Sequence, residues 1–370
     1  MDITATIFLP LAASAGAGAI AWTWIKFVLL AGVIIIAGLK LTRYGDVFTE
    51  KFNLSHGFVG FIFIGWATSL PEMVITIASI SDPEIANPNY AVGNIFGSCY
   101  FNLFIIALVA AVFGVGPFFS KVDRNLVLSC ALSMIMILTA MLALIAPTVF
   151  PGYTRMWDPL GGSGYHVSIF AFIIFGMYFT FSVLVFRHDR HMRLEGEGPS
   201  PEPEGGPQYA DRSTGWTVFK ALIAAGAIVF AGVFLTYTGD DLKNYHNLDA
   251  SLVGTLFFAI VSSLPELVTA LGAARLFLYD MAVGSIFGSN IFNLMILALA
   301  DFLYVPATVF HPVSSKHLVT GIFVLVLSSL CIVGLTYRTK RKIGRVGMDV
   351  IAMIVVYFIG VYLIFFMKGG

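Results

Sequence analysis

Thr68-Ser69-Leu70-Pro71-Glu72 places two hydroxyls, a proline and a carboxylate inside an apolar segment, and Ser262-Ser263-Leu264-Pro265-Glu266 does the same later in the chain. The likeness continues downstream of each stretch. Ala91-Val92-Gly93-Asn94-Ile95-Phe96-Gly97-Ser98 is matched by Ala282-Val283-Gly284-Ser285-Ile286-Phe287-Gly288-Ser289, and Phe101-Asn102-Leu103 by Phe292-Asn293-Leu294. Chance repetition of so dense a pair is improbable, so the sequence indicates an internal repeat.

The composition is typical of a membrane protein. Of 370 residues, 58% are hydrophobic and 11% are charged, whereas a soluble domain carries about 25% charged residues. A surface with so few charges has to face lipid. The net charge of zero gives no electrostatic reason to bind nucleic acid. Cys99, Cys130 and Cys331 lie in apolar runs and are expected to be small buried hydrophobes.

Ten apolar segments are long enough to cross a bilayer, which takes roughly 20 residues. They cover residues 22–43, 57–81, 88–113, 126–147, 166–187, 216–238, 250–275, 280–303, 317–337 and 347–367. Residues 3–20 are a candidate for a short extra segment. Residues 188–215 hold four glutamates among several Pro and Gly, a composition typical of a solvated linker. We therefore expect a first five-helix repeat over 1–187, a linker over 188–215 and a second five-helix repeat over 216–370.

Lys and Arg are divided unevenly between the two sides that alternating spans define. One side receives most of them, including the cluster within residues 338–345, and the other receives Arg155, Lys243, Lys316 and Lys368. The positive-inside rule then places the linker in the cytoplasm and both termini outside. This orientation indicates a plasma or inner membrane.

Five spans per repeat is an odd number, so the second repeat inserts upside down relative to the first. The sequence therefore predicts an all-α membrane protein of ten transmembrane helices, arranged as two inverted five-helix repeats with broken second and seventh helices. Inverted repeats place a substrate site near the membrane midplane, where the halves meet, and they permit alternating access.

Glu72 and Glu266 are the charged residues that the repeat places inside apolar spans. A charge at the centre of a membrane helix costs about 2.5–3.5 kcal/mol, so two charges at equivalent positions argue for a function. The alternative is a structural ion pair with a buried Lys or Arg. No basic residue lies within the motif spans before Arg275, which disfavours that alternative.

Each glutamate follows a proline, Pro71 or Pro265. Proline lacks an N–H and its ring clashes with the carbonyl four residues back, so each helix is expected to bend or break there. Freed carbonyls can serve as ligands where they line a polar cavity. Hydroxyls stand beside each break, at Thr68, Ser69, Ser262 and Ser263, although a single Ser or Thr in a membrane helix often bonds its own backbone.

Polar residues also recur every fourth residue along the third span of each half. The stripes are Asn94, Ser98 and Asn102 in the first half and Ser285, Ser289 and Asn293 in the second. A competing reading is a close helix seam, because Gly93 and Gly97, like Gly284 and Gly288, form GxxxG patterns. Both can hold, with glycines bringing helices together and polar residues facing a cavity.

The candidate ligands are all oxygen atoms or amides, with no His or Cys at matching places in both motifs. Hard cations such as Ca2+ or Na+ suit such ligands, and zinc or copper do not. Two carboxylates neutralise one divalent cation. No Walker motif is present, so ATP-driven pumping has no support. We expect no cofactor and no enzymatic activity.

The paired segments resemble the two alpha repeats of the calcium/cation antiporter superfamily, in particular the sodium/calcium exchangers of prokaryotic type. The resemblance covers nearly the whole chain apart from the linker. It implies that the second and third helices of each half form the ion site and that the first and sixth helices slide as access switches. The implied ligands are Glu72, Glu266, Thr68, Ser69, Ser262, Ser263, Ser98, Ser289, Asn102, Asn293 and the carbonyls of Gly65 and Ala259.

The sequence departs from that pattern in charge. Some sodium/calcium exchangers carry an aspartate at one of the two third-span positions, whereas this chain has Asn102 and Asn293. Two carboxylates do not compensate three Na+, and proton/calcium exchangers of the superfamily often use two glutamates with two asparagines. Asn is also usual where Cys99 stands.

Three functions therefore stand side by side. The first is Ca2+ antiport driven by Na+, and the second couples the same Ca2+ site to H+, with both glutamates taking up protons as Ca2+ leaves. The third is a cation channel or a non-transporting membrane receptor, which the inverted repeat disfavours. The expected partners are membrane lipid and the transported ions, Ca2+ and Na+ or H+, and no nucleic acid.

Overall fold

Helices make up nearly all of the computed structural model, which describes residues 17–81, 88–113, 118–149, 167–194, 213–245, 262–304, 307–311, 313–314, 316–338 and 341–366. In the first half they are α2 (Ala17–Phe52), α3 (His56–Val59), η1 (Gly60–Ile64), α4 (Gly65–Ser81), α5 (Pro88–Phe113), η2 (Phe118–Lys121), α6 (Leu126–Val149) and α7 (Ile169–Leu194). In the second half they are α8 (Thr214–Tyr245), α10 (Leu264–Arg275), α11 (Tyr279–Leu303), α12 (Lys316–Tyr337) and α13 (Met348–Phe366), with a short antiparallel hairpin of β1 (Lys342–Ile343) and β2 (Val346–Gly347).

The helices confirm an integral membrane protein of the all-α class. Within the described residues, eight helices are long and apolar enough to cross a membrane, and Met348–Ile364 of α13 is a shorter apolar helix. The predicted span over 250–275 is described only from residue 262, where it contains α10. The full set of ten spans in an inverted repeat therefore stays a prediction.

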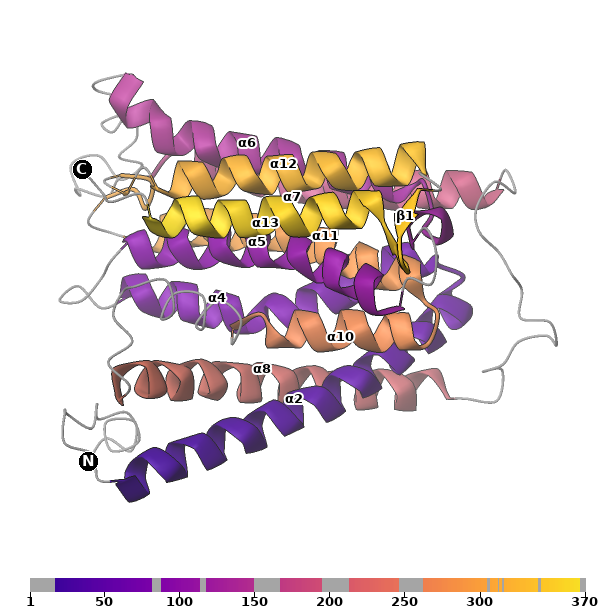
Figure 1. The fold of residues 1–370 in the computed structure, drawn as a ribbon, viewed down its shortest axis with the longest axis horizontal. Helices are drawn as coiled ribbons and strands as arrows, with labels where there is room; N and C mark the ends of the chain where they lie inside the picture. The colour runs from indigo at the N-terminus through magenta and orange to yellow at the C-terminus, as the bar shows by residue number, and fades with distance from the viewer. Residues whose placement is uncertain are drawn as a thin grey trace.

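Helix packing follows a pattern in which the two halves exchange partners. α4, the second span of the first half, packs against α11, the third span of the second half. The equivalent pair, α10 of the second half and α5 of the first, is also in contact. The same holds for α2 on α10 and α8 on α4, and for α5 on α12 and α11 on α6. Figure 1 shows α5 and α11 in the middle of the bundle, with α2 and α8 together along one edge. This exchange is the packing expected of two structurally related repeats.

The first helices of the two halves, α2 and α8, run antiparallel. Ile34 of α2 packs with Ala231 and Leu235 of α8. Lys40, further along α2, lines a groove together with Lys220, which lies near the start of α8. Higher numbers on one helix therefore face lower numbers on the other. Opposite directions for equivalent helices are what an inverted repeat requires.

The second span is interrupted, but not at the predicted place. Pro71 lies inside α4, which is continuous through it. The irregular segment is the π-helical η1, which ends where α4 begins. A wider π turn is a frequent way of relieving strain in a helix, and such turns are often found at functional sites. In the second half Pro265 instead stands in the first turn of α10, where its missing N–H is tolerated.

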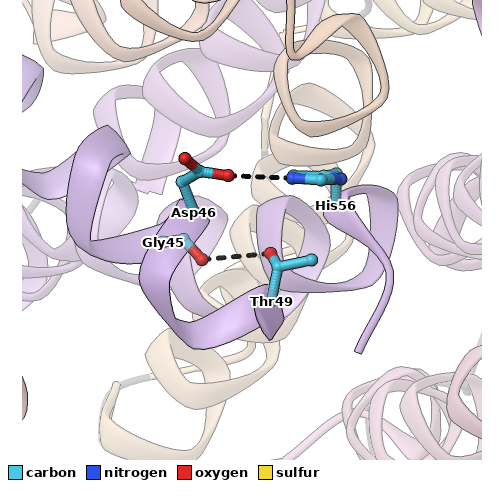
Figure 2. A network of polar contacts seen from close by, with 4 residues as sticks. All are labelled: Gly45, Asp46, Thr49 and His56. Atoms are coloured by element: carbon cyan, nitrogen blue, oxygen red, sulfur yellow. Dashed lines mark hydrogen bonds and ion pairs between the residues drawn. The ribbon is translucent and has the colours of Figure 1, made fainter. Parts of the chain in front are cut away.

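Side chains tie the end of α2 to the start of the second span. Asp46 Oδ1 lies 3.0 Å from His56 Nε2, and beside this pair Thr49 Oγ1 donates a hydrogen bond to the Gly45 carbonyl at 3.1 Å (Figure 2). Asn53, between the two helices, has a φ of 51°. Asn tolerates this left-handed conformation better than most residues, and it ends α2.

The linker is shorter than predicted at its start. α7 continues to Leu194, although residues 188–194 were assigned to the linker, and α8 already begins at Thr214. Residues 188–194 contain no Gly or Pro, so nothing in their backbone chemistry stops the helix before Gly196. Residues 195–212, which hold the four glutamates, lie outside the described residues.

Candidate cation site

Glu72 and Glu266 are buried where the two halves of the chain meet. Glu72 lies in α4 and Glu266 in the first turn of α10, with exposed fractions of 0% and 2%. Ser69 precedes Glu72 by three residues and so shares its face of α4. Ser69 Oγ donates a hydrogen bond to Glu266 Oε1 at 3.0 Å. The carboxylate of one half therefore lies against the helix face that carries the carboxylate of the other.

Two pairs of hydroxyls also bridge the halves. Thr68 Oγ1 lies 3.3 Å from Ser289 Oγ, and Ser263 Oγ donates to Ser98 Oγ at 3.4 Å. Each pair joins the second span of one half to the third span of the other. All four side chains are buried. The structure thus brings these four predicted residues together with the two glutamates at one seam.

The backbone carbonyl of Gly65 faces the same hydroxyls. It accepts a hydrogen bond from Ser289 Oγ at 3.2 Å and lies 3.3 Å from Thr68 Oγ1. Gly65 is the first residue of α4, directly after the π-helical segment η1. A Cβ at this position would lie 2.8 Å from the Ser289 nitrogen. Ala259, the predicted counterpart, lies outside the described residues.

Amides from the third spans complete the cluster. Asn102 on α5 and Asn293 on α11 are fully buried. Asn102 Nδ2 donates to Asn290 Oδ1 at 3.0 Å, and Asn290 Nδ2 donates to the Cys99 carbonyl at 3.5 Å. Asn290 is a residue that the sequence reasoning missed. It occupies the position of Cys99 in the other repeat, so the matched motifs do not single it out, and the signal that could have found it is the family pattern, in which Asn is usual at this position.

The remaining members of the predicted polar stripes, Asn94 and Ser285, have other partners. Asn94 Nδ2 donates to Thr76 Oγ1 at 3.0 Å and lies 3.5 Å from the Glu72 carbonyl oxygen, which fastens α5 to α4. Ser285 Oγ donates to the Ala282 carbonyl of its own helix at 2.9 Å. Ser262, from the hydroxyl pair of the second motif, is buried just before α10. The stripes therefore divide into Asn94, which ties α5 to α4 of the same half, Ser285, which bonds within its own helix, and Ser98, Ser289 and Asn102, which contact residues of the other half.

The glycine seam is confirmed on α11. A Cβ on Gly284 would collide with the Gly57 carbonyl, and a Cβ on Gly288 would collide with the Phe61 carbonyl. α11 thus packs with its backbone directly against α3 and η1, which the small residues of a GxxxG pattern allow. This close packing brings Ser289 to the Gly65 carbonyl.

Unpartnered buried polar atoms gather at this seam. Among the described residues, the buried side-chain atoms with no hydrogen-bond partner include both carboxylate oxygens of Glu72, Glu266 Oε2, Asn102 Oδ1, and Oδ1 and Nδ2 of Asn293. Buried polar groups are nearly always hydrogen-bonded, and an uncompensated buried charge costs several kcal/mol. Five of these six atoms are oxygens, and with the neighbouring hydroxyls and the Gly65 carbonyl they are enough to supply the 6–8 oxygen ligands that Ca2+ takes. The donor set fits a hard cation.

A family model described as sodium/calcium exchanger protein matches residues 22–184 and 216–367. The chain belongs to the sodium/calcium exchanger family. The same model matches two separate stretches of this exchanger, and the interval between them falls at the predicted linker, which agrees with an internal repeat. Membership confirms the resemblance to calcium/cation antiporters and places the chain among membrane cation antiporters rather than enzymes.

Relatives of this exchanger include curated membrane proteins and a solved structure. Inner membrane protein YrbG of Escherichia coli (strain K12) is 25% identical over 86% of the chain and 92% of its own length. Sodium/calcium exchanger MaX1 of Methanosarcina acetivorans is 27% identical over 38% of the chain and 40% of its own length. A solved structure of the sodium-calcium exchanger NCX_Mj is 19% identical, covers 92% of this chain and 98% of its own, and superimposes with a TM-score of 0.66. The last likeness shows a common fold.

Proposed function

We propose that this protein exchanges Ca2+ for Na+ across a membrane by alternating access, using Glu72 and Glu266 as the charged ligands of one Ca2+. The observation that carries the proposal is the set of unpartnered carboxylate oxygens buried at the seam between the halves. The names of the relatives, which include a sodium/calcium exchanger, support the choice of Na+ as the counter-ion. The full ligand set is the one that the sequence predicts.

Obligatory exchange follows from the charges at the site. Without a cation, two carboxylates face the same buried region, and an uncompensated buried charge costs several kcal/mol. Closing the protein around an empty, charged site is therefore unfavourable, so the site switches access from one side of the membrane to the other only when a cation is bound. Ca2+ and the counter-ions neutralise the same two charges and compete for the same oxygens. Because each half supplies one carboxylate, relative movement of the halves changes the coordination and allows release.

H+ is a second candidate counter-ion, and a specific observation favours it. The third-span positions carry the neutral amides of Asn102 and Asn293 rather than a third carboxylate. Two protons neutralise Glu72 and Glu266 as completely as one Ca2+ does. In this alternative the oxygens, the fold and the access switch stay the same, and only the ion that returns is different.

Flux into liposomes of defined content separates the two candidates. The purified protein is reconstituted, and Ca2+ uptake is measured with an outward Na+ gradient at equal pH or with an outward H+ gradient in the absence of Na+. We expect uptake with the Na+ gradient and none with the H+ gradient alone. Uptake that follows pH without Na+ would establish the proton alternative. Uptake that needs neither gradient would contradict antiport.

We also propose that the linker faces the cytoplasm and that both termini lie on the opposite side. The uneven distribution of Lys and Arg supports this orientation. Single cysteines introduced into a variant without Cys99, Cys130 and Cys331 test it. A cysteine in place of Ser200 should react with an impermeant maleimide only from the cytoplasmic side, and labelling from the other side would reverse the orientation.

A further inference from the structure

A groove of about 480 Å³ lies between α2 and α8, apart from the cation site. Apolar residues including Val33, Ile36 and Ile223 line one part of it, and Lys40, Tyr44 and Lys220 line the rest. Val33, Ile36 and Ile223 have exposed fractions of 42%, 60% and 57%. The groove thus joins an apolar surface that faces lipid to a cluster of hydrogen-bond donors.

The basic part of the groove lies near one membrane interface. Trp216 in the first turn of α8 is exposed and stacks on Phe219 with ring centroids 5.3 Å apart. Exposed Trp residues at helix ends mark the level of the lipid headgroups. Lys220 is one turn further along α8, about 6 Å by the helical rise, and its Nζ lies 5.2 Å from the centre of the Trp216 ring. Lys220 is therefore within reach of a lipid phosphate.

The two lysines have no carboxylate to pair with in the part of the chain that the structure describes. The ion pair between Asp46 and His56 involves neither lysine. A Lys within an apolar span is costly unless it reaches the interface or an anionic partner, and Lys40 stands within the span predicted over 22–43. Two neighbouring ammonium groups also repel each other. An anion between Lys40 and Lys220 relieves both costs.

We propose that this groove binds one anionic phospholipid, with its phosphate between Lys40 and Lys220 and an acyl chain along Val33, Ile36 and Ile223. The Tyr44 hydroxyl supplies a further donor at the headgroup end. Basic pockets between membrane helices on the cytoplasmic side are suited to acidic headgroups. One lipid molecule then contacts the first helix of both halves at once. The site needs no cation bound at the glutamates, so it stands independently of the exchange proposed above.

Native mass spectrometry of the detergent-purified full chain tests this proposal. Phosphatidylglycerol or phosphatidylcholine is added in turn, and the lipid-bound fraction is measured. We expect phosphatidylglycerol to be retained at about tenfold or greater preference, given two basic side chains. The variant Lys40→Gln/Lys220→Gln should lose that preference, and Lys40→Arg/Lys220→Arg should keep it. Lys26→Gln, on the same helix but outside the groove, is the matched control and should resemble the unmodified protein.

Three outcomes would overturn the proposal. The first is equal retention of the two lipids by the unmodified protein. The second is an undiminished preference for phosphatidylglycerol in the glutamine variant. The third is displacement of phosphatidylglycerol by inorganic phosphate at millimolar concentration, which would identify an anion site rather than a lipid site. Elution of the glutamine variant as a single species shows that a lost preference is not the result of unfolding.

Discussion

Ser69 shows at the scale of single residues how the two halves share one site. It stands on the helix that carries Glu72, yet its hydroxyl donates to Glu266. Neither carboxylate oxygen of Glu72 has a hydrogen-bond partner among the described residues. One carboxylate is thus oriented by a neighbour, and the other is left available for a cation.

Replacing Ser69 by Ala removes this donor and leaves both carboxylates unsupported. A hydrogen bond to a charged group contributes about 1.5–3 kcal/mol, so we expect the half-saturating Ca2+ concentration for uptake to rise by roughly tenfold or more. Thr139→Ala is the control, because that hydroxyl donates to the Ile135 carbonyl of its own helix at 2.9 Å. An unchanged Ca2+ dependence in Ser69→Ala would contradict the assigned contact.

Site residues could be predicted from the sequence where the same residue type recurs at the matching position of both motifs. Glu72, Ser69 and their counterparts appear twice in the sequence, and the structure brings them to the same seam. Asn290 was missed because Cys99 occupies its position in the other half, so comparison of the motifs hides it. Its contact with Asn102 depends on packing between α5 and α11, which a linear sequence does not display.

At the scale of helices, the contact of α11 with α3 and η1 determines how the residues of the cation site are positioned. The backbones touch at Gly284 and Gly288, so the position of Ser289 relative to Gly65 is fixed by close packing rather than by side-chain length. The sequence predicted this seam from its GxxxG pattern. It misplaced the break in the second span, since α4 runs continuously through Pro71 and the irregular segment is the π-helical η1 before it.

Gly288→Ala should prevent normal folding, because the new Cβ meets the Phe61 carbonyl and backbone atoms cannot move aside as a flexible side chain can. Overpacking of this kind typically costs 1–3 kcal/mol or more. Gly176→Ala on α7, where the described residues leave space around the added atom, is the control and should be as stable as the unmodified protein. Thermal unfolding followed in detergent gives the comparison, and equal midpoints for the two variants would contradict the seam.

Gly232 of α8 offers a test of movement between helices. A Cβ there would lie 2.7 Å from Pro71 Cγ, so α8 passes close to the proline of the second span. We expect Gly232→Val to slow Ca2+ uptake several-fold while Ca2+ binding changes little, because the larger side chain obstructs sliding. Gly226→Val on the same helix has no described atom within 4 Å of its Cβ and serves as control. Equal rates in the two variants would show that this contact does not limit transport.

Net charge is the property that matters at the scale of the whole molecule. The described site carries two carboxylates, one from each half, and neutral amides at Asn102 and Asn293. One Ca2+ balanced by two monovalent ions moves no net charge. We therefore expect exchange in liposomes to be unaffected by a membrane potential set with K+ and valinomycin.

Asn293→Asp adds a third carboxylate and should make the exchange respond to that potential, since three monovalent ions are then needed to neutralise the site. Asn290→Gln, which adds no charge, is the control. A clear response to potential in the unmodified protein would contradict the two-charge account.

The overall architecture was more predictable than its boundaries. Apolar segments, an odd number of spans per half and the doubled motif predicted two repeats inserted in opposite directions, and α2 and α8 run antiparallel. The start of the linker was misjudged because the helix-forming residues 188–194 carry charges and read as solvated. Hydropathy predicts where a helix leaves the lipid, but the helix itself can continue into water until residues such as Gly or Pro end it.

Ca2+ uptake by Glu72→Gln and Glu266→Gln in liposomes with an outward Na+ gradient tests the central claim most directly. Glutamine keeps the shape and removes one charge, and loss of one partner from a buried charged site costs roughly 3–5 kcal/mol. Each variant should elute as a folded species and show uptake reduced at least about a hundredfold. Normal uptake by either folded variant would contradict a Ca2+ site built on these two carboxylates.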